Sequence, residues 1–183
     1  RTFNIENNAT APADLTLDGP IGGSPGAAIL KSGAGTLRLA GAGNTQPGLV
    51  SATAGVLELA KSSGDAIGTG GLATSSTGIV RLAAGEQIHN GASISIGAAD
   101  ESFLELNNFT ETVGPLTITQ SDANDYSGVK TGATGILVLN GNLTLNNNAN
   151  SSSADGREVL ITGTGSELTP ATDGFLDLGG TTR

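Results

Sequence analysis

The sequence predicts an all-β fold, a single elongated parallel β-solenoid (β-helix) with no substantial helix, from three observations. One short phrase, a glycine and a small or apolar residue followed by Leu-x-Leu, recurs along the 183 residues. Within the phrase, apolar and polar residues alternate, which is the period of a half-buried strand. No stretch of useful length has helical apolar spacing. Because a five-residue strand cannot bury its apolar face alone, we expect the copies to stack on one another.

The phrase has six copies, and their spacing indicates a repeat array. They occupy residues 35–39, 55–59, 78–82, 102–106, 135–139 and 174–178, with Ser102 in place of glycine in the fourth. The first four begin 20, 23 and 24 residues apart, and the next gaps are 33 and 39, so these contain an insertion or an extra turn. We expect residues 1–183 to form one solenoid domain, a unit of a longer array or fibre, with residues 28–60 as its clearest repeat.

Further strands are expected between the copies of the phrase. They are residues 2–5, 15–17, 29–32, 49–51, 94–96, 116–119, 143–145 and 159–162. Glycine-rich, proline-rich and asparagine-rich stretches separate them and predict turns and loops. In Leu37-Arg38-Leu39 and Leu57-Glu58-Leu59 we expect the leucines to point inward and the charges outward.

The composition suits a solenoid better than an ordinary globular core. There are 29 Gly and no Cys, Met or Trp, and only 3% of the residues are aromatic. A narrow interior can be filled by stacked Leu, Ile, Val and Ala. The absence of cysteine has two readings, chance or an exported bacterial surface protein that avoids thiols in an oxidising compartment. We favour the second and expect an extracellular position on a bacterial cell surface.

The charge restricts the partners. The net charge is −9, from 8 basic and 17 acidic residues, and the basic residues are scattered singly. Nucleic acids and anionic membranes require clustered Lys and Arg, so neither is expected as a partner. No run approaches the ~18 apolar residues of a membrane span, so membrane insertion is not expected. The chain begins with Arg1-Thr2-Phe3 and no initiator Met, which favours a processed or excised piece of something longer.

One segment carries a family resemblance. Residues 30–45 read Leu-Lys-Ser-Gly-Ala-Gly-Thr-Leu-Arg-Leu-Ala-Gly-Ala-Gly-Asn-Thr, and residues 51–59 read Ser-Ala-Thr-Ala-Gly-Val-Leu-Glu-Leu. This pattern resembles the autotransporter-associated β-strand repeat of bacterial passenger domains and secreted surface proteins, although residues 45–47 stand where the family often has Tyr. Residues 107–117 resemble the inter-repeat strand of such passengers. The resemblance implies a right-handed β-helix, an extracellular position and no cofactor, and it is not specific for any activity.

The two ends of the chain resemble the two sides of one junction. The chain stops at Gly-Gly-Thr-Thr-Arg and starts at Arg-Thr-Phe-Asn-Ile, and similar proteins carry a continuous Gly-Gly-Thr-Arg-Thr-Phe-x-Ile phrase. A solenoid without caps leaves an open sheet edge that can pair with another chain. We therefore expect end-to-end continuation, within one polypeptide or between copies. The residues expected to carry it are Thr2, Phe3, Asn4 and Ile5 at one end and Phe175, Leu176, Asp177 and Leu178 at the other.

Candidate catalytic and metal-binding residues are few, and each has a plainer interpretation. His89 is the only histidine, so it is interpreted as a surface residue and not a catalytic base. Asp122 and Asp125 could offer oxygen ligands to calcium but lack the spacing of a known calcium loop, so a solvated loop is favoured. Glu58 and Glu105 could form a glycosidase pair. The preferred interpretation is a ladder of alternating charge that also contains Arg38 and Arg81.

The sequence therefore predicts a non-catalytic extracellular structural protein. Its unit would continue end to end to build a bacterial surface stalk or filament used in adhesion or matrix. The expected partners are copies of itself, with glycans or a host or matrix surface as further candidates. The alternatives are a β-helix carbohydrate-active enzyme and a glycan-binding adhesin. Four Phe and one Tyr offer little aromatic surface for stacking on sugars, which weakens both. No catalytic, cofactor-binding or metal-binding residue is predicted.

Overall fold

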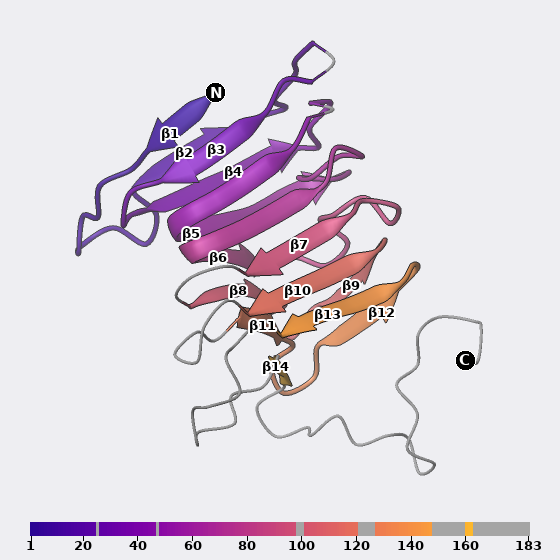
Figure 1. Ribbon diagram of the computed structural model, residues 1–183. Coiled ribbons are helices and arrows are strands. Elements are labelled where there is room, and N and C mark those ends of the chain that lie inside the picture. The colour runs from indigo at the N-terminus through magenta and orange to yellow at the C-terminus, as the bar shows by residue number, and fades with distance from the viewer. Residues whose placement is uncertain (25, 47, 98–100, 121–126, 148–159, 163–183) are drawn as a thin grey trace.

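The computed structural model describes residues 1–162 except 25, 47, 98–100, 121–126 and 148–159. Within these residues the chain forms strands and no helix, and every strand pairing is parallel. In Figure 1, β7, β10 and β13 run across the front towards the left, and the chain returns behind them as it descends, which is a right-handed winding. The predicted fold class, an all-β right-handed parallel solenoid, is confirmed.

The strands stack into sheets that form the faces of the solenoid. The first face contains, in order, β1 (Thr2–Asn4), β3 (Ile29–Ser32), β5 (Val50–Ser63), β6 (Leu72–Leu82), β7 (Ile94–Gly97), β10 (Leu116–Gln120) and β13 (Leu143–Asn147). The second face contains β2 (Leu15–Asp18), β4 (Thr36–Ala42), the later parts of β5 and β6, β8 (Ser102–Glu105), β11 (Ser127–Lys130) and β14 (Leu160–Thr162). A short third face contains β9 (Thr110–Val113) and β12 (Ile136–Leu139).

The core is a set of columns that run through the coils. Strand register places Leu37, Leu57, Val80, Leu104 and Val129 one above another, and all five are fully buried. Each apolar side chain therefore packs mainly on the equivalent side chain of the next coil. The inward leucines predicted from the period-2 pattern are confirmed.

The phrase at residues 135–139 is an exception to the predicted series. Although we grouped it with the four copies before it, its strand β12 pairs with β9 on the third face. The strand that follows β8 on the second face is β11, whose Ser127 lies beside Ser102. These two residues are 25 positions apart, close to the earlier spacing, so the long gap before residue 135 holds an additional strand.

A glycine corner joins the first and second faces within the long strand β5. Gly55 has a φ of +63°, and an added Cβ would lie 2.6 Å from the carbonyl oxygen of Gly33 and 2.7 Å from the carbonyl carbon of Ala34. Glycine is therefore required here both by the backbone conformation and by the close approach of the preceding coil.

Gly64 provides a matched comparison for Gly55. Its φ is +67°, but an added Cβ would come no closer than 3.4 Å to any neighbour. We expect Gly64→Ala to lower the free energy of unfolding by about 1 kcal/mol, the cost of the left-handed backbone. Gly55→Ala should cost about 3 kcal/mol, because a steric term of 1–3 kcal/mol is added. Urea denaturation measures both losses, and equal losses would show that coil contact at this corner is not tight.

Candidate functional site

The predicted N-terminal residues lie at an open edge of the first face. Strand β1 pairs with β3, and no described strand pairs with its other side. The carbonyl of Arg1 accepts a hydrogen bond from the N–H of Leu30 at 2.8 Å, and the N–H of Ile5 donates to the carbonyl of Ser32 at 2.9 Å. Since backbone groups alternate sides along a strand, those of Thr2 and Asn4 face away from β3. They are the groups that another strand would meet.

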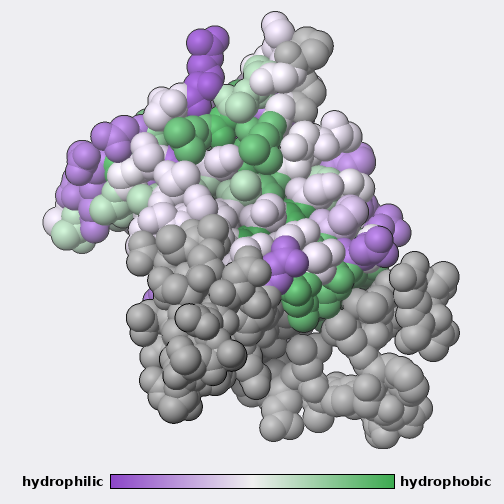
Figure 2. All heavy atoms as spheres, viewed as in Figure 1, coloured by the Kyte–Doolittle hydropathy of each residue, from purple (hydrophilic) through white to green (hydrophobic). Residues whose placement is uncertain are grey.

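The second face has the same open edge. Strand β2 pairs with β4, and no described strand covers its outer side. Phe3, Leu15 and Leu17 pack against the core but remain only half-buried, because no described coil lies above them. Figure 2 shows apolar residues at the surface near this end of the stack. Unpaired strands beside partly exposed apolar side chains form a surface suited to strand addition.

The other predicted contact segment, Phe175, Leu176, Asp177 and Leu178, lies outside the described residues, as do Asp122 and Asp125. Within the described chain, the last strands are β13 on the first face and β14 on the second. Leu145 of β13 lies in register with the buried Ile118 of β10, yet it is 52% exposed. The sequence identified strands in this region but gave no reason to treat β13 as an edge.

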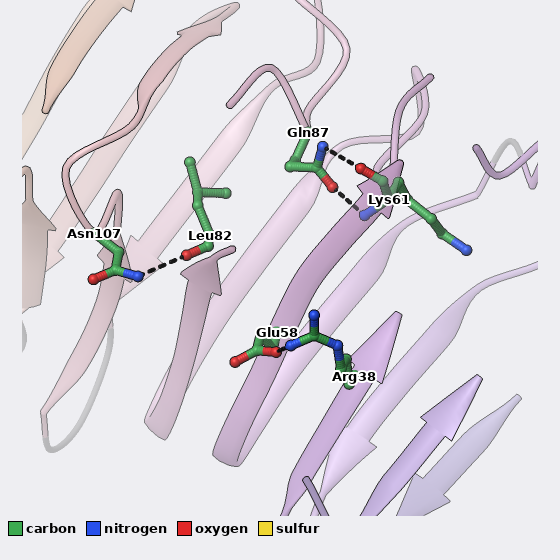
Figure 3. Close-up of polar contacts among 6 residues, drawn as sticks. All are labelled: Arg38, Glu58, Lys61, Leu82, Gln87 and Asn107. Atoms are coloured by element: carbon green, nitrogen blue, oxygen red, sulfur yellow. Dashed lines mark hydrogen bonds and ion pairs between the residues drawn. The ribbon is translucent and has the colours of Figure 1, made fainter. Parts of the chain in front are cut away.

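The predicted charge ladder is confirmed on the outer side of the second face. Register aligns Arg38, Glu58, Arg81 and Glu105 in one column. Arg38 Nη1 donates to Glu58 Oε1, and Arg81 Nε donates to Glu105 Oε2 at 2.8 Å (Figure 3 shows the first pair). The arginine side chains are about 40% exposed, so each pair contributes about 1 kcal/mol or less.

Lys130 extends this ladder by one position, which the sequence did not reveal. It is in register with Glu105, and its Nζ lies 3.8 Å from Glu105 Oε1. The same ammonium group lies 3.3 Å from the centroid of the Phe103 ring, a cation–π contact. Lys130 was missed because it belongs to no copy of the Leu-x-Leu phrase.

The residues considered for catalysis are engaged in other interactions. Glu58 and Glu105 lie two strands apart with Arg81 between them, and each carboxylate is paired with an arginine. His89 is exposed in a turn, where its Nδ1 accepts a hydrogen bond from the N–H of Gly91 at 3.1 Å. Among the described residues there is no group of three or more His, Cys, Asp or Glu that could hold a metal ion, and no helix that could cross a membrane.

Buried polar side chains connect successive coils along one corner. Lys61 Nζ donates to the carbonyls of Gly19 at 2.7 Å and Ala40 at 2.6 Å. The Gln87 amide bonds the backbone of Lys61 twice, accepting from its N–H at 2.6 Å and donating to its carbonyl at 3.2 Å (Figure 3). The Glu111 carboxylate accepts the N–H groups of Gln87 and Ile88, both at 2.8 Å. We call Lys61, Gln87 and Glu111 the polar spine.

The polar spine replaces backbone pairing where the chain turns. Its three side chains are almost fully buried, and so is Lys31, whose ammonium donates to the carbonyls of Ser32, Gly33 and Ala54 at 2.7–3.0 Å. Burial lowers the pKa of both lysines. The sequence does contain a signal for Lys61, because it follows Leu57 and Leu59 at the inward period of two. The Leu-x-Leu phrase was taken to end at residue 59, so that signal was not used.

Glu111 is the most strongly perturbed carboxyl group of the polar spine. Burial raises its pKa from 4.5 to about 7, opposed by the two backbone N–H donors and reinforced by Glu86 and Asp65. Its side chain is fully buried. The folded protein therefore carries a carboxyl group that gains its charge near neutral pH.

We expect this group to make the protein less stable as the pH rises. Well below pH 4.5, Glu111 is protonated in both the folded and the unfolded states. Between pH 4.5 and about 7 the unfolded state loses this proton while the folded state retains it. Above pH 7 the folded state bears a buried charge. The free energy of unfolding should fall between pH 5 and pH 8 by an amount on the order of 3 kcal/mol, at 1.36 kcal/mol per pKa unit. Urea denaturation across this range measures the change.

Glu111→Gln is the control for that titration. The amide accepts one of the two N–H groups, so we expect a loss of about 1–2 kcal/mol at pH 5. It cannot ionise, so the fall between pH 5 and pH 8 should largely disappear. Asp14, whose pKa is lowered by the N–H groups of Thr36 and Asn8, titrates below this window. Equal pH dependence in both proteins would assign the effect to another group.

The described residues form a parallel β-solenoid, and no described strand covers the outer side of its first coil. No family model, curated protein or solved structure matches this chain.

Proposed function

We propose that the chain is a non-catalytic extracellular structural protein, a solenoid unit that continues end to end to build a bacterial surface stalk or filament used in adhesion or matrix. The observation that carries the proposal is the open N-terminal edge. There β1 and β2 each pair with one described strand, on one side, and Phe3, Leu15 and Leu17 are half-buried. An additional coil would satisfy the free backbone groups and cover the apolar side chains in a single step.

The sides of the solenoid offer less for a partner to bind. On the second face the charged column pairs with itself through Arg38–Glu58 and Arg81–Glu105. On the first face the outward positions of β7 and β10 hold Ser95, Thr117 and Thr119, which are small and uncharged. The absence of cysteine and the resemblance to the autotransporter-associated repeat support a bacterial surface location.

Electron microscopy and light scattering of the purified protein test the assembly. We expect elongated particles whose mass rises with protein concentration. Asn4→Pro should reduce assembly at least about tenfold, because proline removes an N–H that faces the open edge. Its urea midpoint should change little, since that N–H does not face β3.

Asn4→Ala is the matched control, because it removes the same side chain and keeps the N–H. It should assemble like the unmodified protein. Assembly of Asn4→Pro at the unmodified level would show that the β1 edge is not used. Particles of monomer mass at all concentrations would contradict assembly between copies and restrict the proposal to continuation within one longer polypeptide.

A further inference from the structure

We propose that copies of this chain join head to tail in one defined register, with β13 of one copy pairing in parallel with β1 of the next. This inference rests on the proposed function and specifies its partner as a second copy. In this register Thr144 of one copy lies beside Thr2 of the next, and Leu145 stacks on Phe3. The junction would continue the β10–β13 pairing by one more strand.

The first support is that the two ends of the described stack have the same layout. The first face begins with β1 and its last described strand is β13, while the second begins with β2 and its last described strand is β14. Because all pairings are parallel, β13 and β1 run in the same direction when two copies are stacked along the axis. A junction of this kind uses different surfaces on the two copies and does not close, so it generates a fibre.

The second support is the unbroken register of the columns. One outward column on the first face consists of Thr2, Leu30, Ser51, Ala73, Ser95, Thr117 and Thr144. The neighbouring inward column begins at Phe3 and ends at Leu145. Extending both columns by one strand places Thr2 beside Thr144 and Phe3 beside Leu145.

The third support is the exposure of the residues that would meet. Leu145 is 52% exposed although it belongs to an inward column, and Phe3 is only half-buried at the opposite end of that column. Stacking the two side chains would bury both. In the next outward column, Asn146 would lie beside Asn4, an arrangement in which side-chain amides can form a ladder. A slip by one residue between the copies would set the outward Thr144 beside the inward Phe3, which register rules disfavour.

The second face is consistent with the same register. One column of paired residues there begins at Leu15 on β2 and passes through the buried Leu37, and the last residue in its backbone register is Ile161 on β14. The same stacking that aligns Thr144 with Thr2 continues this column from Ile161 to Leu15. Both open strands of the first coil, β1 and β2, would then gain a partner together.

A disulfide trap tests the register. The chain contains no cysteine, so each introduced thiol is unique. Thr2 and Thr144 are both exposed and point outward. Paired Cα atoms on neighbouring strands lie about 4.8 Å apart, within the range that a disulfide can span. Thr2→Cys and Thr144→Cys chains, one carrying a mass tag, are mixed under a mild oxidant, and the mixed dimer is measured by non-reducing gel electrophoresis.

We expect the mixed dimer to form at least about tenfold faster than the dimer of Thr2→Cys with Thr117→Cys. Thr117 lies in the same outward column, one strand further from the edge. Equal rates for Thr117→Cys and Thr144→Cys would overturn the proposal. So would a predominance of Thr2→Cys homodimers, which indicates a head-to-head contact, or of Asn4→Cys with Thr144→Cys dimers, which indicates a two-residue slip.

The outcomes separate this inference from the proposed function. Assembly that is sensitive to Asn4→Pro but gives no Thr2–Thr144 disulfide would overturn the register and leave the structural role in place. No self-association by light scattering, with no mixed disulfide, would overturn the copy-to-copy junction itself. The open edge would then be a site for another segment of the same polypeptide.

Discussion

The parallel backbone ladder is the interaction on which the rest of this structure depends. It fixes each side chain directly above the equivalent side chain of the next coil. The residue at each position of the phrase therefore contacts the residue at the same position in the neighbouring copies. Leu39, Leu59 and Leu82 form one buried column, while Arg38 and Glu58 lie side by side in the neighbouring outward column. A translational geometry of this kind explains both the repeating phrase and the alternation of charge sign along it.

Where the chain turns, the ladder stops and leaves backbone groups inside the protein. Buried polar groups without partners cost free energy, so these corners require side chains that reach from one coil to another. Three kinds of side chain supply these contacts: the ammonium group of Lys61, the amide of Gln87 and the carboxylate of Glu111. The apolar columns would tolerate an exchange of coils, but an ammonium group lacking its carbonyl acceptors would not be tolerated. The polar spine therefore helps to specify which coil follows which.

The sequence predicted the features that depend on a single strand or on the regular spacing of the first four copies of the phrase, and it missed contacts outside that regular series. The period-2 pattern placed Leu37 inward and Arg38 outward, and the strand at residues 2–5 was found as β1. The partner of each strand was harder, because coil length varies. The phrase at residues 135–139 was grouped with the earlier copies, yet its strand pairs with β9 on the third face. Lys130 was overlooked because the strand that continues the second face, β11, contains no copy of the phrase. Glu111 had no signal in its own segment, since its acceptor role depends on Gln87 and Ile88 one coil away.

The same geometry decides where binding free energy is available. A partner on the second face would have to displace Arg81 from Glu105, exchanging one charged contact for another with little net gain. A partner at the N-terminal edge would displace no strand pairing among the described residues, because no described strand meets the outward backbone groups of Thr2 and Asn4 and the side chain of Phe3 is only half-buried. Each backbone hydrogen bond gained there contributes about 0.5–1.5 kcal/mol. Because the charged column on the described second face is already paired, the proposed association would gain more free energy at the end of the stack than on that face.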